Sequence, residues 1–258
     1  EAFLGCRRLS RIDIADSVKT IGDYAFADMN ALTRLRTPSQ DMEFETYVFA
    51  YNHNLVNLKF TNKLIGEHMF DSCDNKNFTT LVIPKITHKV LANISNNSPL
   101  IAIDEINGDI RPYAFANCTG LTTISFEIGD NDTNGANYLG KYMFANCTGI
   151  EELYVTDNIK YIDEAALYMT TSLHTLVLPF VGAEVGIEGT EESLFGWIFG
   201  YNASASSDLV EQVTQIRNID DHTFDVMTSI PKGLVNLTVT DETVVAYGAF
   251  SNIMTITN

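Results

Sequence analysis

The sequence contains few basic residues for its length. Lys and Arg number 16 against 33 Asp and Glu, so the 258 residues carry a formal net charge of −17 at pH 7. Nucleic acid and anionic membrane surfaces repel a chain with this charge. The composition therefore predicts that neither of them is a partner.

Long apolar runs are also missing. No stretch has the length and apolar character of a membrane-spanning helix, so this fragment is not expected to insert into a membrane. No signal peptide is visible, because residue 1 already lies inside a repeat unit that begins with Ala2-Phe3. The chain is therefore expected to be a piece of a longer protein, truncated at both ends.

Catalytic signatures are absent as well. The patterns G-x-S-x-G and H-E-x-x-H do not occur, and neither does a phosphate-binding glycine loop. The five histidines are scattered over different repeat positions, and Asp220-Asp221-His222 is interpreted as a solvated turn. The sequence therefore predicts that the chain is not an enzyme.

Cysteine is scarce and regularly placed. Each of the four cysteines follows the aromatic residue of a repeat unit by three positions: Cys6, Cys73, Cys118 and Cys147. Residues that share a repeat position line up inside a stack, which predicts buried thiols that act as small apolar side chains. A disulfide between Cys118 and Cys147 is the alternative, since an extracellular setting would permit it. No C-x-x-C motif or Cys/His pairing indicates zinc.

What the sequence does contain is an internal repeat. The stretch Tyr113-Ala-Phe-Ala-Asn-Cys-Thr-Gly-Leu-Thr-Thr-Ile-Ser-Phe126 returns as Tyr142-Met-Phe-Ala-Asn-Cys-Thr-Gly-Ile-Glu-Glu-Leu-Tyr-Val155. Looser copies run from one end of the chain to the other, with a period in the low twenties. Such a period indicates one small module that is stacked many times.

Each unit contains aliphatic residues with the spacing L-x-x-L-x-L. This spacing predicts a short strand whose alternate side chains point into the stack. About ten units can be counted, and residues 1–258 are expected to form a single domain. The predicted strands are centred on Ile12, Leu35, Leu58, Leu81, Ile103, Ile124, Leu153, Leu176, Val213 and Leu237.

The segments between the strands must return over the opposite face. They are as short as Val18-x-x-Ile21-Gly22 or Ile159-x-x-Ile162, which is too short for a long helix. The predicted fold is a right-handed, curved solenoid of the α/β class. A parallel sheet lines its concave face, and short strands with 3-10 or helical turns lie on its convex face.

The repeat resembles that of the BspA-like, or treponemal-type, leucine-rich-repeat family, whose unit reads roughly I-x-x-I-G-x-x-A-F-x-x-C-x-x-L-x-x-I-x-I-P. Residues 18–38 and 110–126 follow this unit closely, and the resemblance covers nearly the whole chain. The segment Ser193-Leu-Phe-Gly-Trp-Ile-Phe-Gly-Tyr-Asn202 is similar to an L-G-x-x-F-G insertion of some bacterial members. The resemblance implies a secreted or surface-attached bacterial protein that binds other proteins or cells. Similar arrays in eukaryotic microbes leave a second source open.

Two insertions interrupt the repeat, near residues 127–140 and 180–208. Loops inserted on one face of a solenoid often carry binding. The first insertion contains Asp130, Asp132 and Asn134, spaced as at the start of a calcium loop. The later positions of such a loop do not match, so a polar turn without metal is the alternative. No other cofactor is expected.

The second insertion combines acidic residues with several aromatic ones. If exposed, Trp197 and Phe199 would form a binding hot spot. Alternatively, Leu194, Trp197, Ile198 and Tyr201 have the spacing of a short amphipathic helix that folds back over the side of the solenoid. The spacing favours the second interpretation and leaves the first open.

Charge is distributed unevenly along the chain. Residues 1–63 hold eight basic and eight acidic groups, whereas residues 64–258 hold eight and 25. Outward positions of the first strands predict a basic patch on the concave face, made of Arg11, Arg34, Arg36 and Lys59. Later strands present neutral or acidic groups, with Tyr154 as a candidate contact. A solvated surface that serves solubility is the alternative.

These features together predict a protein-binding or adhesion module at the cell surface or outside the cell. Recognition is assigned to the concave side chains and the two insertions, and the partner to a protein or glycan on another cell or in the matrix. The alternative is a structural spacer within a larger surface protein that carries an enzyme.

Overall fold

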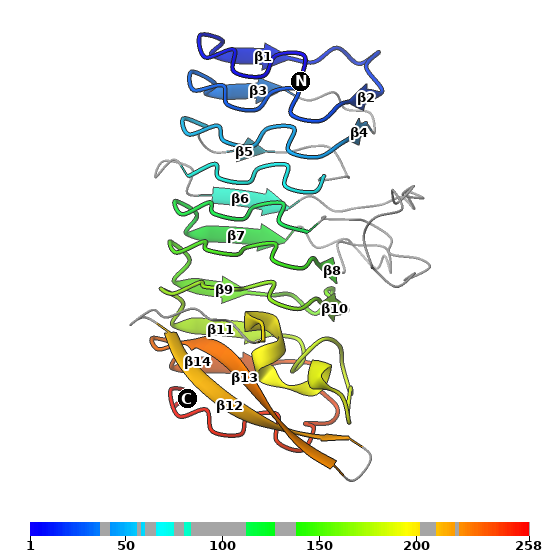
Figure 1. The fold of residues 1–258 in the computed structure, drawn as a ribbon, viewed down its shortest axis with the longest axis vertical. Coiled ribbons are helices and arrows are strands. Elements are labelled where there is room, and N and C mark those ends of the chain that lie inside the picture. The colour runs from blue at the N-terminus through cyan, green and yellow to red at the C-terminus, as the bar shows by residue number, and fades with distance from the viewer. Residues whose placement is uncertain are drawn as a thin grey trace.

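The computed structural model describes residues 1–36, 42–55, 58–59, 66–74, 80–83, 112–126, 138–201, 210–219 and 222–257. Within these residues, short strands follow one another along a single long axis (Figure 1). The strands on one side of this stack are β1 (Arg11–Asp13), β3 (Arg34–Arg36), β5 (Leu58–Lys59), β6 (Thr80–Ile83), β7 (Thr123–Phe126), β9 (Glu152–Tyr154), β11 (Thr175–Leu178) and β14 (Asn236–Val239).

The pairs formed among these strands are parallel and join equivalent residues of different units. β1 pairs with β3, β6 pairs with β5 and β7, and β11 pairs with β9 and β14. The aliphatic residue at each strand centre lies opposite its counterpart, as Ile12 does with Leu35 and Leu176 with Leu237. The predicted parallel-strand solenoid is confirmed, and eight of the ten predicted strand centres lie in these strands.

Shorter strands occupy the opposite side of the solenoid (Figure 1). They are β2 (Thr20–Ile21), β4 (Glu43–Phe44), β8 (Tyr138–Leu139) and β10 (Tyr161–Ile162). β2 pairs with β4 and β8 pairs with β10, both in parallel. The second residue of each strand is buried, so these pieces close the far side of the core. The predicted short extended segments on this side are confirmed.

The predicted strand at Ile103 does not stand in the stack between Leu81 and Ile124. Ile103 itself lies outside the described residues, but β6 and β7 pair directly, with Leu81 opposite Ile124. The N–H of Phe70 also donates to the carbonyl of Ala114 at 2.8 Å. The turns on either side of the intervening segment are therefore neighbours, and the prediction of a strand between them is wrong.

The predicted strand at Val213 belongs to a different sheet. It lies in β12 (Val210–Ile219), which pairs antiparallel with β13 (His222–Pro231) in a long hairpin. β11 pairs with β14 instead, so the assignment of Val213 to the parallel stack is wrong. Apolar residues recur at every third position from Val210 to Ile219, which imitates the L-x-x-L spacing of a repeat unit.

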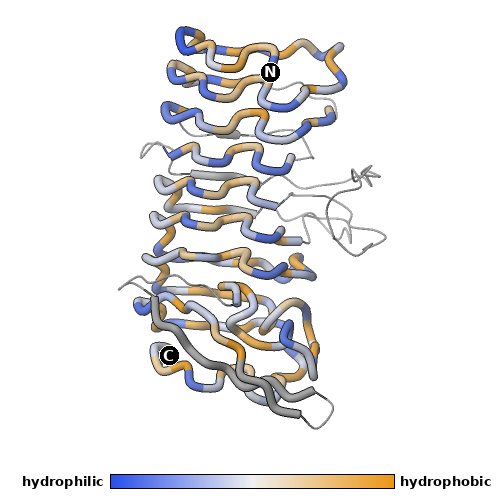
Figure 2. The backbone as a smooth tube through the Cα atoms, in the orientation of Figure 1, coloured by the Kyte–Doolittle hydropathy of each residue, from blue (hydrophilic) through white to orange (hydrophobic). Residues whose placement is uncertain are grey.

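A file of stacked phenylalanines runs through the core. Its members are Phe3, Phe26, Phe49, Phe70, Phe115 and Phe144, and neighbouring ring centroids lie 5.4–5.9 Å apart. The last four of them are fully buried. Figure 2 shows hydrophobic residues returning at the same place in successive turns. Because each ring packs against rings of adjacent units, this phenylalanine ladder couples each unit to the next.

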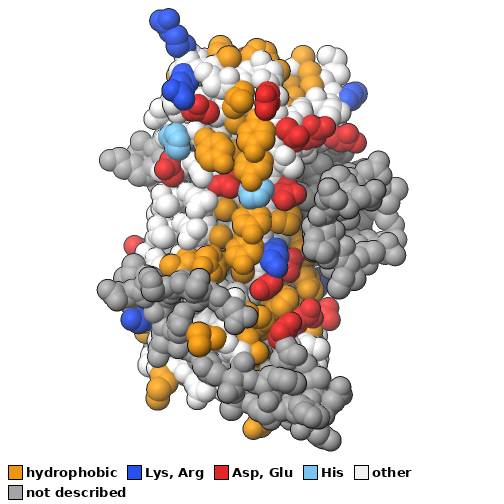
Figure 3. All heavy atoms as spheres, viewed as in Figure 1, with side chains coloured by type: hydrophobic (Ala, Val, Ile, Leu, Met, Phe, Trp, Pro, Cys, Tyr) orange, Lys and Arg blue, Asp and Glu red, His pale blue; other side chains and the backbone are white. Residues whose placement is uncertain are grey.

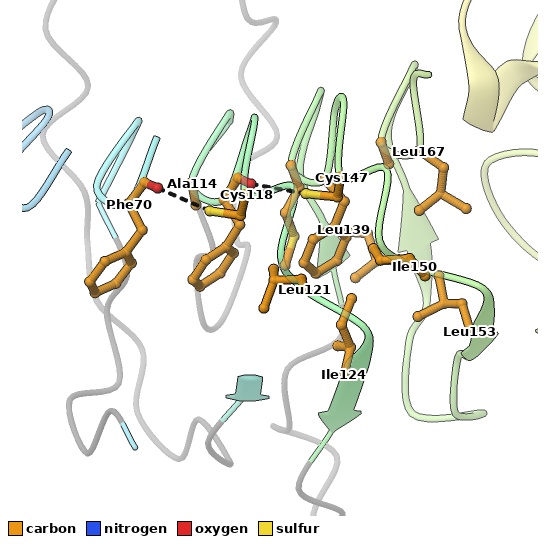
Figure 4. Packing of buried hydrophobic residues seen from close by; sticks show 14 of the residues in the cluster. Phe70, Ala114, Cys118, Leu121, Ile124, Leu139, Cys147, Ile150, Leu153 and Leu167 are labelled. Carbon is orange, nitrogen blue, oxygen red and sulfur yellow. Dashed lines mark hydrogen bonds between the residues drawn. The ribbon is translucent and has the colours of Figure 1, made fainter. Parts of the chain in front are cut away.

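The position three residues after each ladder phenylalanine also faces the core. Cys73, Cys118 and Cys147 are buried there as free thiols, and Cys6 is free and partly buried. The thiol of Cys118 donates to the carbonyl of Phe70 at 3.2 Å (Figure 4). Burial raises the pKa of Cys147 to about 12, which makes this thiol unreactive. The prediction of buried thiols is confirmed for these three, and the alternative disulfide between Cys118 and Cys147 is not formed.

Asn52 holds the same position after Phe49. Its side chain donates to the carbonyls of Phe26 at 3.0 Å and Phe49 at 2.6 Å, and accepts from the N–H of Met29 at 2.9 Å. The residue is 0% exposed. A buried amide is stable here because all of these backbone groups find a partner in it.

The insertion after β11 supplies a missing turn of the stack. It contains the 3-10 helices η1 (Glu191–Ser193) and η2 (Phe195–Phe199). The N–H of Leu167 donates to the carbonyl of Ile198 at 2.8 Å, and the N–H of Phe195 donates to that of Ala249 at 3.0 Å. Equivalent bonds join the other turns of the solenoid, so η2 takes the place of a turn.

Glu242 accepts hydrogen bonds from the loop that precedes η1. Its carboxylate accepts the N–H of Val181 at 2.9 Å and that of Gly186 at 2.8 Å. Burial alone would raise the pKa of Glu242, but hydrogen bonds from Val181, Gly186, Val244 and Thr243 lower it below its ordinary value. The carboxylate is therefore held in its ionised form and orders this part of the insertion.

Candidate binding surface

Charged side chains project from β1 and β3 on the strand face of the solenoid. Arg11 pairs in register with Arg34, and Asp13 pairs with Arg36. All four residues are exposed. Because neighbouring strands lie about 4.8 Å apart, the structure brings the three arginines together, and we call them the arginine patch.

Asp13 neutralises one member of the arginine patch. Nη2 of Arg11 lies 2.7 Å from Oδ2 of Asp13, and Nε donates to the same oxygen at 2.9 Å. Neither Arg34 nor Arg36 forms an ion pair with another residue in the described part of the chain. The positive charge of the patch therefore rests on Arg34 and Arg36.

Lys59 and Tyr154 were predicted to extend this surface. The backbone of Lys59 pairs with Val82 in the sheet, but its side chain lies outside the described part. Tyr154 is 54% exposed, and its hydroxyl donates to Glu152 at 2.9 Å. It projects from β9, which β5, β6 and β7 separate from β3 (Figure 1). Tyr154 is therefore not part of the arginine patch.

Trp197 and Phe199 are core residues. Their exposed fractions are 7% and 0%, and the indole N–H of Trp197 donates to the carbonyl of Ile162 at 2.7 Å. Their burial supports the favoured interpretation, in which the insertion packs against the solenoid, and the alternative of an exposed hot spot at these two aromatic residues is wrong. Their burial follows from the position of η2, whose side chains fill the core where a turn of the solenoid would stand.

The predicted calcium ligands Asp130, Asp132 and Asn134 lie outside the described residues. Among the residues that the structure describes, no group of three or more His, Cys, Asp or Glu is arranged to hold a metal ion. Calcium binding in the first insertion stays a prediction.

Helix is scarce in the described part of the chain. None of its helices has the length and apolar character that crossing a membrane requires.

A second surface was not predicted. In five units the residue two positions before the ladder phenylalanine is aromatic: Tyr24, Tyr47, His68, Tyr113 and Tyr142. Their rings stack with centroids 4.2–4.8 Å apart. All of them remain partly exposed, and we call this file the aromatic stripe. Figure 3 shows an apolar column along the stack with acidic side chains beside it. The sequence indicates this stripe through the repeated pattern aromatic-x-Phe.

A chain of hydrogen bonds supports the centre of the stripe. Nδ1 of His68 lies 2.8 Å from Oδ2 of Asp71, whose other oxygen accepts from Ser72 at 2.7 Å and Asn117 at 3.0 Å. Burial would raise the pKa of Asp71, but these bonds from His68, Asn117 and Ser72 lower it. The carboxylate of Asp71 is therefore ionised and adds negative charge beside the stripe.

Comparison with known proteins gives a family match and a related structure. A family model described as "BspA type Leucine rich repeat region", present in 6 copies, matches residues 1–101 and 85–195. The crystal structure of a leucine-rich repeat protein from Bacteroides ovatus ATCC 8483 is similar, with a TM-score of 0.43 and 22% sequence identity. The similarity covers 74% of this chain and 46% of that chain. A comparison with curated proteins gives no match.

Proposed function

Because the chain belongs to the BspA-type leucine-rich-repeat family, we propose that it is a protein-binding module that captures an acidic partner at the arginine patch. Repeats of this kind suggest a protein-interaction or surface module, and solenoids built from them are typically non-catalytic. They offer an open, rigid surface rather than an enclosed pocket.

The observation that carries the proposal is the exposed pair Arg34 and Arg36 on β3. Alternation along a strand directs both side chains to the same side of the sheet. Guanidinium groups bind carboxylates in a bidentate geometry, so two neighbouring guanidinium groups suit an acidic segment. The remainder of the molecule carries the excess of negative charge. Long-range repulsion by these negative charges would direct an acidic segment to the arginine patch.

The family resemblance also supports a place for the module outside the cell, secreted or attached to the cell surface. There the partner would be an acidic protein or glycan on another cell or in the matrix, and the module would serve adhesion. The proposal assigns recognition to the strand face and gives no role to Trp197 or Phe199, whose side chains are buried.

Reversing the charge of the arginine patch tests the proposal. A fluorescein-labelled octaglutamate peptide is expected to bind the unmodified chain at low ionic strength, as measured by fluorescence anisotropy. The double variant Arg34→Glu/Arg36→Glu is expected to bind it at least about ten-fold more weakly, since both contacts become repulsive. The melting temperature should change little, because both side chains are exposed.

The matched control is Lys160→Glu/Lys232→Glu, which makes the same change in net charge at exposed positions away from β3. This control should bind the peptide nearly as well as the unmodified chain does. Equal losses in the two double variants would show that net charge alone is responsible. Absence of octaglutamate binding to the unmodified chain would favour the alternative role, a structural spacer.

A further inference from the structure

The aromatic stripe occupies a backbone conformation that aromatic residues seldom adopt. Its five members have φ between +52° and +57°, in the left-handed region that mainly Gly, Asn and Asp populate. The residues two positions after the ladder phenylalanine are also left-handed. Small polar side chains prevail there, as at Asp28, Ser72, Asn117 and Asn146. Both positions of each turn are left-handed, but only the position before the ladder phenylalanine carries an aromatic ring in all five units.

Stacking stabilises the rings and decides what they present to solvent. Each inner ring lies parallel to two neighbours, within 3–13°, so its faces are covered and its edge is exposed. Stacking on a sugar ring and cation–π contact both require ring faces, which removes glycans and bare cations as ligands of the inner rings. The exposed ring edges form an apolar strip that runs along the axis of the solenoid.

Carboxylates lie beside this strip. The pKa of Tyr47 is raised to about 12, first by burial, then by Tyr24 and Tyr51, and further by the acidic side chains of Asp71 and Glu67. Figure 3 shows acidic side chains along the apolar column. An apolar strip with an acidic margin is complementary to side chains that combine an apolar stem with a positive end, namely Lys and Arg.

Lys141 already brings a cation to an aromatic ring of the stripe and to a carboxylate within the molecule. Its Nζ lies 5.8 Å from the ring centroid of Tyr142 and donates to Glu164 at 2.6 Å. The ammonium group thus lies over the ring at the end of the stripe while it binds a carboxylate. Glu67 is exposed, and its ion-pair partner in the described part of the chain is His68, at a distance of 4.0 Å. Glu67 is therefore placed to receive a cation from outside.

We propose that the aromatic stripe, with the exposed Glu67 at its margin and the buried, ionised Asp71 behind it, is a second binding site that takes an extended polypeptide segment rich in Lys or Arg. The segment lies along the solenoid axis, with its stems across the ring edges and a positive group at Glu67. This site is separate from the arginine patch and selects the opposite charge, so it does not rest on the proposed function.

Binding of a fluorescein-labelled octalysine peptide, followed by fluorescence anisotropy, tests the site. Glu67→Lys is expected to weaken binding about ten-fold, because a carboxylate contact becomes repulsive. Tyr51→Ser removes a ring that is 38% exposed and lies 6.4 Å from that of Tyr47. It is expected to weaken binding about three-fold through lost apolar contact. Glu188→Lys makes the same charge change at an exposed residue of the insertion and should leave binding within about two-fold.

A second peptide separates apolar contact from simple attraction to a negative protein. An octapeptide of 2,4-diaminobutyric acid keeps the ammonium groups on shorter stems, and it is expected to bind about ten-fold more weakly than octalysine. Equal binding of the two peptides, equal losses in Glu67→Lys and Glu188→Lys, or no octalysine binding would each overturn the proposal. Circular dichroism establishes that each variant is folded, and Tyr51→Ser decides the outcome if Glu67→Lys does not fold. Octalysine binding should survive Arg34→Glu/Arg36→Glu, so failure at one surface is distinguishable from failure at the other.

Discussion

Replacing Phe115 with Ala is expected to lower the free energy of unfolding by about 3–5 kcal/mol. The side chain is 0% exposed and lies 5.5 Å from Phe70 and 5.9 Å from Phe144 between ring centroids. Its removal opens a cavity in the phenylalanine ladder and takes one stacking partner from each of these neighbours. Urea denaturation followed by circular dichroism measures the change.

The control is the same substitution at the end of the ladder. Phe3 is 45% exposed and stacks on Phe26 at 5.4 Å, so Phe3→Ala should cost about 1 kcal/mol. Equal effects of the two substitutions would contradict the role of the ladder as the element that couples neighbouring units.

Replacing Asn52 with Ala is expected to cost about 3 kcal/mol, because it leaves buried backbone groups without partners. The N–H of Met29 and the carbonyl of Phe26 both lose the hydrogen bond that the amide supplies. The carbonyl of Phe49 keeps a bond from the thiol of Cys73 at 3.3 Å. Urea denaturation again measures the change in the free energy of unfolding.

The repeat itself offers a rescue variant at this position. Asn52→Cys restores the residue that other units carry there, and its thiol can donate to a carbonyl of the preceding turn, as Cys73 and Cys118 do. It should be more stable than Asn52→Ala by about 1 kcal/mol. If the Cys variant is as unstable as the Ala variant, the hydrogen bonds of this position are not what stabilises it.

Most of the stack could be predicted because its spacing has a direct physical cause. Alternate side chains of a strand must point into the core, so the aliphatic spacing at Ile12, Leu35, Leu153 and Leu176 located four strands and their pairing. The same alternation placed Arg34 and Arg36 on the exposed side of β3. Both results depend only on the alternation of side chains along a strand and on the regular spacing of the repeat.

The two wrong strands show where spacing ceases to be informative. Ile103 and Val213 each satisfy the aliphatic spacing, but neither follows an aromatic residue at the ladder position nine residues earlier, where Ile94 and Ser204 stand. Without a ring to join the phenylalanine ladder, aliphatic spacing does not show whether a segment enters the stack. An aromatic residue at that position supports a strand in the stack, but its absence does not exclude one, since Leu167 and Thr228 stand there before Leu176 and Leu237.

The surfaces were less predictable than the stack. The spacing of Leu194, Trp197, Ile198 and Tyr201 favoured an insertion that folds back onto the solenoid, but no local pattern indicates that η2 takes the place of a turn. The aromatic stripe was visible as a recurrent Tyr or His, as at Tyr24 and Tyr113, but its partial exposure depends on a left-handed turn conformation. Which side of such a turn faces solvent follows from the packing of neighbouring units.

The direct contact of β6 with β7 is tested most simply by a disulfide between them. Thr80 and Thr123 are partners in the register of these strands, which places their Cα atoms about 5 Å apart, within the range of a disulfide. The variant Thr80→Cys/Thr123→Cys is therefore expected to lose two free thiols on mild oxidation, whereas either single variant should lose none, when thiols are counted after denaturation. A strand around Ile103 between them would separate these residues by about 10 Å, beyond the reach of a disulfide. Retention of both thiols would contradict the stacking order on which the position of every later turn depends.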